Sequence, residues 1–369
     1  MCYFFGVIKN KKVFVGVSGG VDSSVSLALL KEQGFDVTGV FLKVWYPDFM
    51  PCDWKNERLS AMRVCAKLQV PFITIDAEKE YKKEVVDYMI QEYRSGRVPN
   101  PDIFCNKYVK FGVFLKKALE MGADFVATGH YAIKQEIGND KEEVIKYELR
   151  ESKDKEKDQS YFLYTLNQDQ LKHILFPVGH LTKPEVRELA KKFELPTATK
   201  KDSQGLCFMG NIDIKEFLSH YIKPKSGKVL NESGKVIGVH EGVEFLTIGQ
   251  RHGFTITEKG NEDSRMFITN KDLDKNTITI SEKKENFDGK IKNFTIKNLH
   301  FISGNEMKLP YKTSVRIRYR QEKQTCSINK TDDLYNITLD EAYRDWETDR
   351  KSTRLNSSHE IPSRMPSSA

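Results

Sequence analysis

Short apolar runs alternate with longer helical patterns over the first 130 residues of the chain. The runs are rich in β-branched and aromatic residues, which favours buried strands, and they lie at 13–17, 37–44, 72–75 and 125–128. Apolar residues at helical spacing are found at 21–33, 57–68, 80–93 and 111–121. Strands separated by helices require right-handed crossovers, so the pattern predicts an α/β domain with a doubly wound parallel sheet.

The pattern changes in the second half of the chain. A charged run at 151–158 predicts a solvated loop, and one more helix is predicted at 184–193. After Cys207, short alternating runs separated by glycine predict strands, at 236–239, 245–248, 277–280, 294–299, 314–320 and 335–339. We therefore expect a small β-rich central domain followed by a C-terminal β-barrel or sandwich.

These changes divide the chain into three predicted domains and a tail. The α/β domain is expected at 1–204, the central domain at 205–286 and the C-terminal β-barrel at 287–343. The segment 344–369 contains six serines in 26 residues and has no period of 2 or 3.6. It resembles vector or adapter sequence more than a natural terminus, and we predict a non-native or disordered tail.

Composition excludes several classes of protein. Hydrophobic residues make up 39% and charged residues 30%, which argues against disorder over most of the length, and no apolar run approaches a membrane span of roughly 20 residues. The segment before the first strand is too short for a secretory signal or a transit peptide. The six cysteines include no CxxC pair, which argues against a zinc ribbon or a disulfide scaffold. We expect a bacterial cytoplasmic protein without a membrane partner.

The strongest local motif is GVSGGVDSS at 16–24, between the first strand and the first helix. Its glycines permit a tight turn, its serines offer hydroxyl donors, and the helix start favours an anionic phosphate. The motif lacks the lysine of a Walker loop and the GxGxxG spacing of dinucleotide sites. An isolated Gly-Gly turn is usually structural, but the whole string at this junction favours a pyrophosphate site. The net charge of +7 adds only weak support for a polyanionic partner.

Two cysteines stand in contexts that favour chemistry. Cys105 follows Asp102 by three residues and precedes a helix predicted to start near Asn106, where the helix dipole favours a thiolate. Cys207 lies between glycines in a segment that predicts a mobile loop. Each cysteine alone is more often a small buried residue, so the polar, glycine- or proline-rich surroundings of both carry the prediction.

The loop resembles the pyrophosphatase loop of the ATP-pyrophosphatase superfamily. The motifs SGGVDSS, NPDIFCNKYVKF, ATGHYA, KDQSYFL, KDSQGLCFMG and TIGQRHGF follow in this order between residues 11 and 343. Together they resemble the tRNA-specific 2-thiouridylase family. The resemblance implies an adenine nucleotide alpha hydrolase-like fold, and ATP-dependent 2-thiolation of the wobble uridine in tRNA anticodons.

The resemblance also implies where ATP binds. Its phosphates are expected at the loop, on Gly16, Val17, Ser18, Gly19, Gly20, Val21, Asp22 and Ser23. Leu42 and Gly129, which follow other strands, are expected to border the nucleotide, in keeping with ligand sites at the carboxyl ends of open α/β sheets. Mg²⁺ is expected with ATP, and Asp22 is either an organiser of that ion or a partner of the helix dipole. No other metal site is expected.

The chemistry implied by the family uses both cysteines. The uridine C2 oxygen attacks the α-phosphate and pyrophosphate leaves, after which the outer sulfur of a Cys207 persulfide attacks C2. Cys105 is the implied catalytic cysteine that cleaves the persulfide, which predicts a Cys105–Cys207 disulfide after turnover. Asp102 is the implied acid/base group or, alternatively, a cap of the following turn. A persulfide donor protein of a sulfur relay is the implied partner, with tRNAs for Lys, Glu and Gln as substrates.

Several residues match tRNA contacts of the family. They are Asn100, Pro101, Asp102, His130, Lys157, Asp158, Gln159, Arg318 and Tyr319. Alternation along a strand at 314–320 would place Arg316, Arg318 and Arg320 on one basic face, which fits a phosphate backbone. A charged strand edge that prevents aggregation is the competing interpretation.

The end of the chain departs from the family, and rival functions remain open. After Tyr343 the Gly-Gln segment and the final apolar strand of the family are missing, which predicts a truncated barrel. An amide-forming ligase with the same loop, an RNA-binding module without activity, and a cluster-dependent thiolase acting on another base are the alternatives. The missing CxxC pair speaks against the last, although an iron–sulfur cluster on Cys105 and Cys207 stays open because cluster ligands need not be contiguous.

Overall fold

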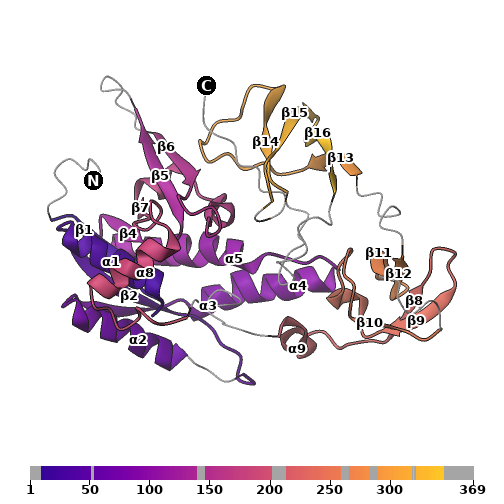
Figure 1. Cartoon of the computed structure of the whole chain (residues 1–369), viewed down its shortest axis with the longest axis horizontal. Helices are drawn as coiled ribbons and strands as arrows, with labels where there is room; N and C mark the ends of the chain where they lie inside the picture. Colours follow the sequence, from indigo (N-terminus) through magenta and orange to yellow (C-terminus); the bar gives the residue numbers. More distant parts are fainter. Residues whose placement is uncertain are drawn as a thin grey trace.

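The computed structural model describes residues 10–50, 54–138, 146–201, 213–258, 266–282, 290–317, 319 and 321–344. Three sheet-containing regions follow one another along the chain, and Figure 1 shows the two later sheets beside each other, away from the first. Cys207, Arg318 and the segment 345–369 lie outside the described residues. No helix within the described ranges is long and apolar enough to cross a membrane.

The first sheet is parallel and has the strand order β3-β2-β1-β4-β7. Its strands are β1 (Lys12–Gly16), β2 (Asp36–Lys43), β3 (Phe72–Asp76), β4 (Phe125–Ala127) and β7 (Ile174–Leu175). Every pairing in it is parallel, which confirms the sheet predicted from the alternation of strands and helices.

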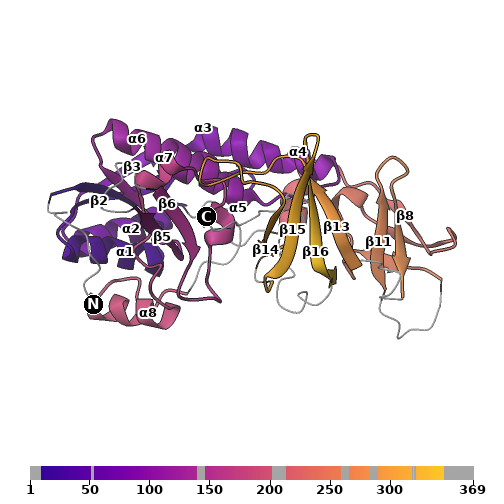
Figure 2. The same cartoon turned by 90° about the horizontal axis from the view of Figure 1, so that it is seen from above.

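Helices cover both faces of this sheet. They are α1 (Val21–Glu32), α2 (Trp54–Lys67), α3 (Glu78–Tyr81), α4 (Tyr88–Arg94), α5 (Pro101–Phe104), α6 (Leu115–Glu120), α7 (Gln168–Lys172) and α8 (Lys183–Lys192). The π-helical segments η1 (Lys82–Asp87) and η2 (Cys105–Phe114) join α3 to α4 and α5 to α6. Figure 2 shows α1 and α8 on one side of the sheet and α3 and α6 on the other.

The two faces of the sheet form two separate apolar cores. Val13 and Val15 of β1 pack with residues of α1, α2 and α8, whereas Phe14 packs with residues of the α3–α4 and α5–α6 segments. This follows from the alternation of side chains along a strand, because successive residues of a strand covered on both sides enter opposite cores. The two cores hold β1 and β4 from both faces of the sheet and so fix the carboxyl ends of these strands.

An antiparallel hairpin and two turns complete this domain. The hairpin, which the sequence did not predict, consists of β5 (Ala132–Ile137) and β6 (Lys146–Glu151). The 3₁₀ helix η3 (Ser160–Leu163) follows it.

The central region begins with α9 (Ile214–Ser219) and contains a five-stranded sheet of order β10-β9-β8-β12-β11. Its strands are β8 (Gly227–Leu230), β9 (Val236–His240), β10 (Phe254–Ile256), β11 (Phe267–Asp272) and β12 (Thr277–Ser281). The strand predicted at 245–248 is wrong, because a 3₁₀ helix, η4 (Val243–Phe245), ends where that strand would begin. Val243 and Leu246 both pack into the core of this sheet, because residues three apart lie on the same side of a 3₁₀ turn.

The last region is a four-stranded antiparallel sheet of order β13-β16-β15-β14. Its strands are β13 (Lys290–Ile296), β14 (Tyr311–Val315), β15 (Gln324–Thr331) and β16 (Leu334–Arg344). β14 ends at Val315, so the strand predicted over 314–320 is wrong beyond that residue. β16 continues to Arg344, the first residue of the predicted tail.

Both later regions contact the α/β domain. The Arg94 guanidinium at the end of α4 donates to the Tyr221 carbonyl at 2.9 Å, and the Lys271 ammonium on β11 donates to the Gly96 carbonyl at 3.1 Å. On the C-terminal side, the Gln168 amide donates to the Ile302 carbonyl at 2.9 Å. The central region is thus anchored at the end of α4 and the C-terminal sheet at the start of α7.

Candidate active site

The loop between β1 and α1 turns at Gly19, which has a φ of 75°. A Cβ on Gly19 would lie 2.7 Å from the Glu57 carbonyl oxygen, so the position requires glycine for both conformation and space. The Ser23 and Ser24 hydroxyl groups both donate to the Gly20 carbonyl, at 3.2 and 2.7 Å. These bonds fix the loop in the shape that the SGGVDSS motif predicts.

The start of α1 has the features of an anion site. Gly20 is its N-cap, and no side chain of the described residues caps the helix. The helix therefore presents its first backbone N–H groups and the positive end of its dipole to a ligand. Gly129 lies against this turn, since a Cβ on it would be 2.7 Å from the Ser23 nitrogen. The loop and Gly129 together fit the phosphates of ATP.

The Asp22 carboxylate at this helix start is already engaged by two donors. The Lys183 ammonium donates to both of its oxygens, at 2.7 and 2.8 Å, and the Tyr131 hydroxyl donates to Oδ1 at 2.7 Å. Among the described residues, no group of three His, Cys, Asp or Glu side chains is placed to hold a metal ion. Because the Lys183 ammonium and the Tyr131 hydroxyl occupy its oxygens, Asp22 acts here as the partner of a lysine rather than as a metal ligand.

A second lysine also reaches the loop. The Lys200 ammonium donates to the Gly19 carbonyl at 3.0 Å. Lys200 precedes the segment that carries Cys207 by a few residues. The Arg187 guanidinium of α8 donates to the Ala198 carbonyl at 3.0 Å, which holds the chain before Lys200 against that helix.

Leu42 lies near the carboxyl end of β2, as expected, but its side chain is buried in the core that contains Phe14 and Phe114. Its position as a neighbour of the nucleotide stays a prediction.

Cys105 lies inside a helix rather than ahead of one. The helix begins at Pro101, with Asn100 as its N-cap, and the Asn100 side chain accepts from the Asp102 backbone N–H at 3.2 Å. The predicted start near Asn106 is wrong because an Asn-Pro pair is itself a strong helix start. Cys105 is fully buried. Its thiol does not lie at the helix end that the sequence argument assumed.

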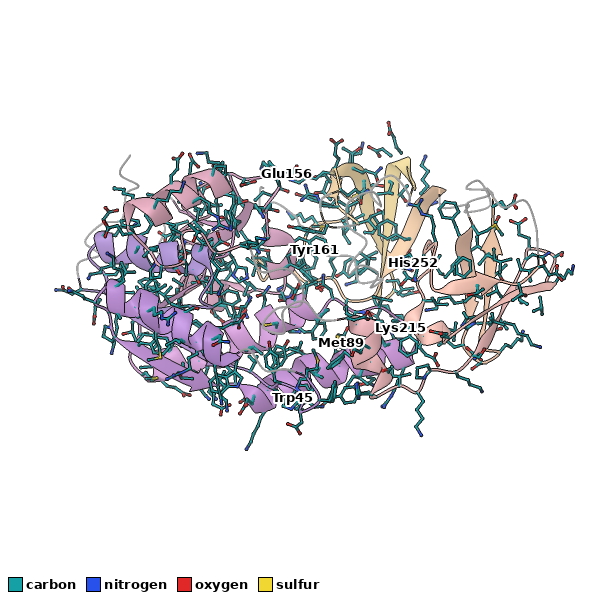
Figure 3. All side chains as sticks on the ribbon, turned by 60° about the horizontal axis from the view of Figure 1, so that its bottom comes forward. Trp45, Met89, Glu156, Tyr161, Lys215 and His252 are labelled. Atoms are coloured by element: carbon teal, nitrogen blue, oxygen red, sulfur yellow. The ribbon has the colours of Figure 1, made fainter. Side chains whose placement is uncertain are left out.

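Asn106 connects the Cys105 helix to the segment that follows the charged loop. Its amide donates to the Phe162 carbonyl at 3.1 Å, and its buried Oδ1 has no hydrogen-bond partner among the described residues. The Phe162 ring lies 4.8 Å from the ring of Tyr319. Figure 3 shows the neighbouring Tyr161 between the α/β domain and the C-terminal sheet. Tyr319 is thereby placed beside the segment that contacts the Cys105 helix.

His130 is buried under aromatic rings. Its Nε2 lies 3.4 Å from the Lys110 ammonium and its Nδ1 lies 2.7 Å from the Thr128 hydroxyl. An ammonium has only donors, so Nε2 accepts and the protonated Nδ1 donates to Thr128. Burial, and then the positive charge of Lys110, lower the pKa of His130 well below its usual 6.5. The His130 side chain is therefore neutral and packs against Phe111 and Phe176. Its role as a tRNA contact stays a prediction.

The charged run at 151–158 is not simply solvated, as predicted, because Asp158 is only 5% exposed. Its carboxylate accepts from the Ser152 N–H at 2.9 Å and from the Ser160 hydroxyl at 2.6 Å. Gln159 joins the Tyr131 backbone twice, as its N–H donates to the carbonyl at 2.8 Å and its side-chain oxygen accepts at 3.0 Å. Lys157 is partly exposed. The loop is ordered by acidic side chains that cap its own N–H groups.

The predicted basic face beyond β14 does not form by strand alternation, since the strand ends at Val315. Arg316 instead donates to Glu151 at 3.0 Å, in an ion pair whose side chains are 19% and 16% exposed. Lys323 contacts the same carboxylate at 3.1 Å. Arg316 therefore holds the C-terminal sheet against the charged loop, and Arg318 lies outside the described residues.

The structure connects several of the predicted residues near the carboxyl ends of β1 and β4. The ATP loop meets Gly129, His130 meets the Cys105 helix through Lys110, and Gln159 meets the loop through Tyr131. Sequence reasoning missed Lys183, Tyr131, Lys110 and Lys200. Tyr131 and Lys110 had a local signal, since they lie in the ATGHYA and NPDIFCNKYVKF motifs, whereas Lys183 is 161 residues from its partner Asp22.

Three family models match successive parts of the chain. They are described as the tRNA methyl transferase HUP domain (residues 11–211), the tRNA methyl transferase PRC-barrel domain (215–282) and the aminomethyltransferase beta-barrel domain (291–345). Curated relatives match along nearly the whole chain. It is 41% identical to the tRNA-specific 2-thiouridylase of Flavobacterium johnsoniae, over 87% of this chain and 90% of that one. The enzyme of the same name from Methylobacillus flagellatus is 42% identical, over 88% and 89%.

Solved structures resemble the chain more weakly. A U34-tRNA thiolase from Methanococcus maripaludis is 18% identical, with a TM-score of 0.35, and the match covers 58% of this chain and 65% of that one. A 4-thiouridine synthetase in complex with RNA and ATP is 20% identical, with a TM-score of 0.33, over 54% of this chain and 45% of that one.

Replacing Gly19 with alanine should destabilise the protein, because the new Cβ would meet the Glu57 carbonyl in a left-handed backbone conformation. We expect Gly19→Ala to lower the free energy of unfolding in urea by about 1–3 kcal/mol. Gly20→Ala is the matched control, since Gly20 has an extended backbone with a φ of −92° and its nearest neighbour would be the Ser18 hydroxyl at 3.3 Å. Equal losses in the two variants would contradict the assignment.

Acid should destabilise the protein in part through His130. Because the pKa of His130 is lowered on folding, the unfolded chain binds the proton more readily, and this contribution to stability is lost as the pH falls below 6.5. Between about pH 7.5 and about pH 5.5, wild type should lose about 1.4 kcal/mol more unfolding free energy than His130→Asn. Urea unfolding at both pH values measures the difference. His252→Asn, at an exposed position, is the control and should lose as much unfolding free energy between the two pH values as wild type. The same loss in His130→Asn would contradict the assignment.

Proposed function

We propose, from the premise that this chain belongs to the tRNA-specific 2-thiouridylase family, that it uses ATP to replace the C2 oxygen of the wobble uridine with sulfur. Membership makes it a tRNA-uridine 2-sulfurtransferase that forms 2-thiouridine in tRNA. The observation that carries the proposal beyond membership is the single connected edge on which the phosphate loop, Gly129 and the Cys105 helix meet. An activated uridine oxygen and a thiol are needed near one another, and the contact between His130 and Lys110 supports this by joining the chain after Gly129 to the helix that carries Cys105.

Activation would take place at the loop. The uridine C2 oxygen attacks the α-phosphorus of ATP and pyrophosphate leaves toward the uncapped start of α1, whose N–H groups stabilise its charge. Asp102, on the first turn of the Cys105 helix, is the proposed group that moves protons on the base. Asn100 and Pro101 are proposed to meet the target base, which has to leave the anticodon stack before its C2 edge can be reached.

Sulfur transfer would follow at the two cysteines. The outer sulfur of a persulfide on Cys207 attacks C2, and AMP leaves with the former C2 oxygen. The Cys105 thiolate attacks the inner sulfur, the sulfur–sulfur bond breaks, and the outer sulfur stays on the uridine. The Cys105–Cys207 disulfide that results requires a reductant. Because the Cys105 side chain is fully buried, the proposal requires its surroundings to open during the cycle.

The wider partners are also proposals. The substrates would be tRNAs for Lys, Glu and Gln, contacted by His130, the 157–159 segment, Arg318 and Tyr319, and the sulfur would come from a relay protein that carries a persulfide. An iron–sulfur cluster gains no support from the described cysteines, because Cys65, Cys105 and Cys326 lie in three different apolar cores. Mg²⁺ would have to arrive with the ATP phosphates.

The direct test is nucleoside mass spectrometry of unmodified tRNA incubated with the protein, ATP, Mg²⁺ and a persulfide donor. We expect 2-thiouridine from the wild type and none above the enzyme-free background from Cys105→Ala or Cys207→Ala. Cys326→Ala is the control, since burial and the Asp340 charge raise the pKa of that thiol to about 11 and keep it unreactive. 2-Thiouridine from Cys207→Ala would show that sulfur reaches the uridine by another path, and no 2-thiouridine from the wild type would contradict the proposal.

The acid/base role of Asp102 has its own test. Asp102→Asn keeps the backbone N–H that Asn100 accepts, so the helix start should survive. We expect the rate of 2-thiouridine formation to fall by about 10²–10⁴-fold while ATP affinity is unchanged. Asp169→Asn, an exposed aspartate in the first turn of α7, is the matched control and should keep the full rate. A rate within about twofold of wild type for Asp102→Asn would refute the role.

A further inference from the structure

The phosphate loop has no cation of its own. Residues 13–30, which include the whole loop and most of α1, contain neither lysine nor arginine. Lys11, just ahead of β1, is paired with Asp124 at 2.8 Å. A triphosphate carries several negative charges, and helix N–H groups provide only partial positive charge. The loop by itself therefore leaves most of the ligand charge unbalanced.

Folding brings Lys183 to this position from a distant helix. It is the first residue of α8, where Thr182 and Glu185 form a capping box, and its own N–H donates to the Asp154 carboxylate at 2.8 Å. The capping box and the bond to Asp154 thus fix the backbone of Lys183. Its ammonium lies 2.7 Å from Asp22 Oδ1, and the side chain is only 13% exposed. A lysine so well held, in contact with the second residue of α1, is placed for a ligand at that helix start.

The two lysine side chains that reach the loop outnumber the one carboxylate at the start of α1. Asp22, Lys183 and Lys200 carry −1, +1 and +1, so these three side chains leave one positive charge beside the uncapped helix. Lys200 contacts the loop through the Gly19 carbonyl alone. Lys183 is the more strongly fixed of the two, because Asp22 and Asp154 hold both of its ends.

We propose that Lys183 is the phosphate-binding cation of this site, and that its ammonium binds the β- or γ-phosphate of ATP and then the departing pyrophosphate. This deepens the proposed function, since it rests on ATP as the substrate. Asp22 holds the ammonium at the helix start in the absence of nucleotide. The charge that develops on the leaving group as the bond to the α-phosphorus breaks is where a fixed ammonium stabilises most.

Equilibrium binding by titration calorimetry, without tRNA, tests this assignment with three probes: ATP, inorganic pyrophosphate and AMP. We expect Lys183→Met to weaken ATP and pyrophosphate by about 10- to 100-fold, the range of a charge-assisted hydrogen bond, and to leave AMP within about twofold. Lys183→Arg should restore most of the affinity. Lys192→Met is the matched control, an exposed lysine of the same helix paired with Glu32 at 3.8 Å, and should bind like wild type.

A folding defect is separated by the double variant Asp22→Asn/Lys183→Met, which leaves no unpaired carboxylate. It should show the same loss for ATP and pyrophosphate, with a circular dichroism spectrum like that of wild type. Unchanged affinities in the Lys183 variants, an equal loss for all three probes, or a wild type that binds neither ATP nor pyrophosphate would each overturn the inference. If ATP binding depends on Lys183 but the wild type forms no 2-thiouridine, the inference about Lys183 stands and only the proposed function is refuted.

Discussion

The Asp22 carboxylate ties together segments that lie far apart in the chain. Lys183 and Tyr131, 161 and 109 residues away, both donate to it, and neither donor is held by Asp22 alone. The Gln159 side-chain oxygen accepts from the Tyr131 backbone N–H, while the Asp154 carboxylate accepts from the Lys183 N–H. One carboxylate at the start of α1 thus connects the phosphate loop to α8, to the chain after β4 and to the charged loop. The Asp22 contacts thus hold the site together from segments that are distant in the sequence.

The connection is possible because the parallel sheet brings two chain segments to one edge. Val15 of β1 pairs with Ala127 of β4, so the chains that leave these strands emerge side by side. Gly129 then approaches the Ser23 nitrogen so closely that no Cβ fits between them. The same approach fixes His130 above Lys110, and through it the helix that carries Cys105. Strand register, rather than the loop sequence, therefore decides which chemistry meets at the phosphate site.

Much of this could be read from the sequence, and the limits are physical. Alternating strands and helices predicted the parallel sheet, and the SGGVDSS string predicted the turn at Gly19, because both depend on local pattern. The start of the Cys105 helix was misplaced because Asn100 and Pro101 were interpreted as ligand contacts and not as a cap. Asp158 was assigned to a solvated loop because charge alternation does not reveal N–H groups that an acidic side chain caps. The Asp22–Lys183 pair has no local signal, since it forms only when α8 packs beside α1.

The docking of the C-terminal sheet adds a further constraint on the cysteine side of the site. Arg316 pairs with Glu151, the His300 imidazole lies 2.9 Å from the Leu166 carbonyl, and Gln168 links Tyr147 to Ile302. All of these contacts fall on the segments that surround residues 159–163. Phe162 in that stretch accepts from Asn106 through its carbonyl and packs its ring near Tyr319. Contacts therefore run from Tyr319 through Phe162 to Asn106, the residue that follows Cys105. The C-terminal sheet is in this way part of the framework that holds the cysteine in place.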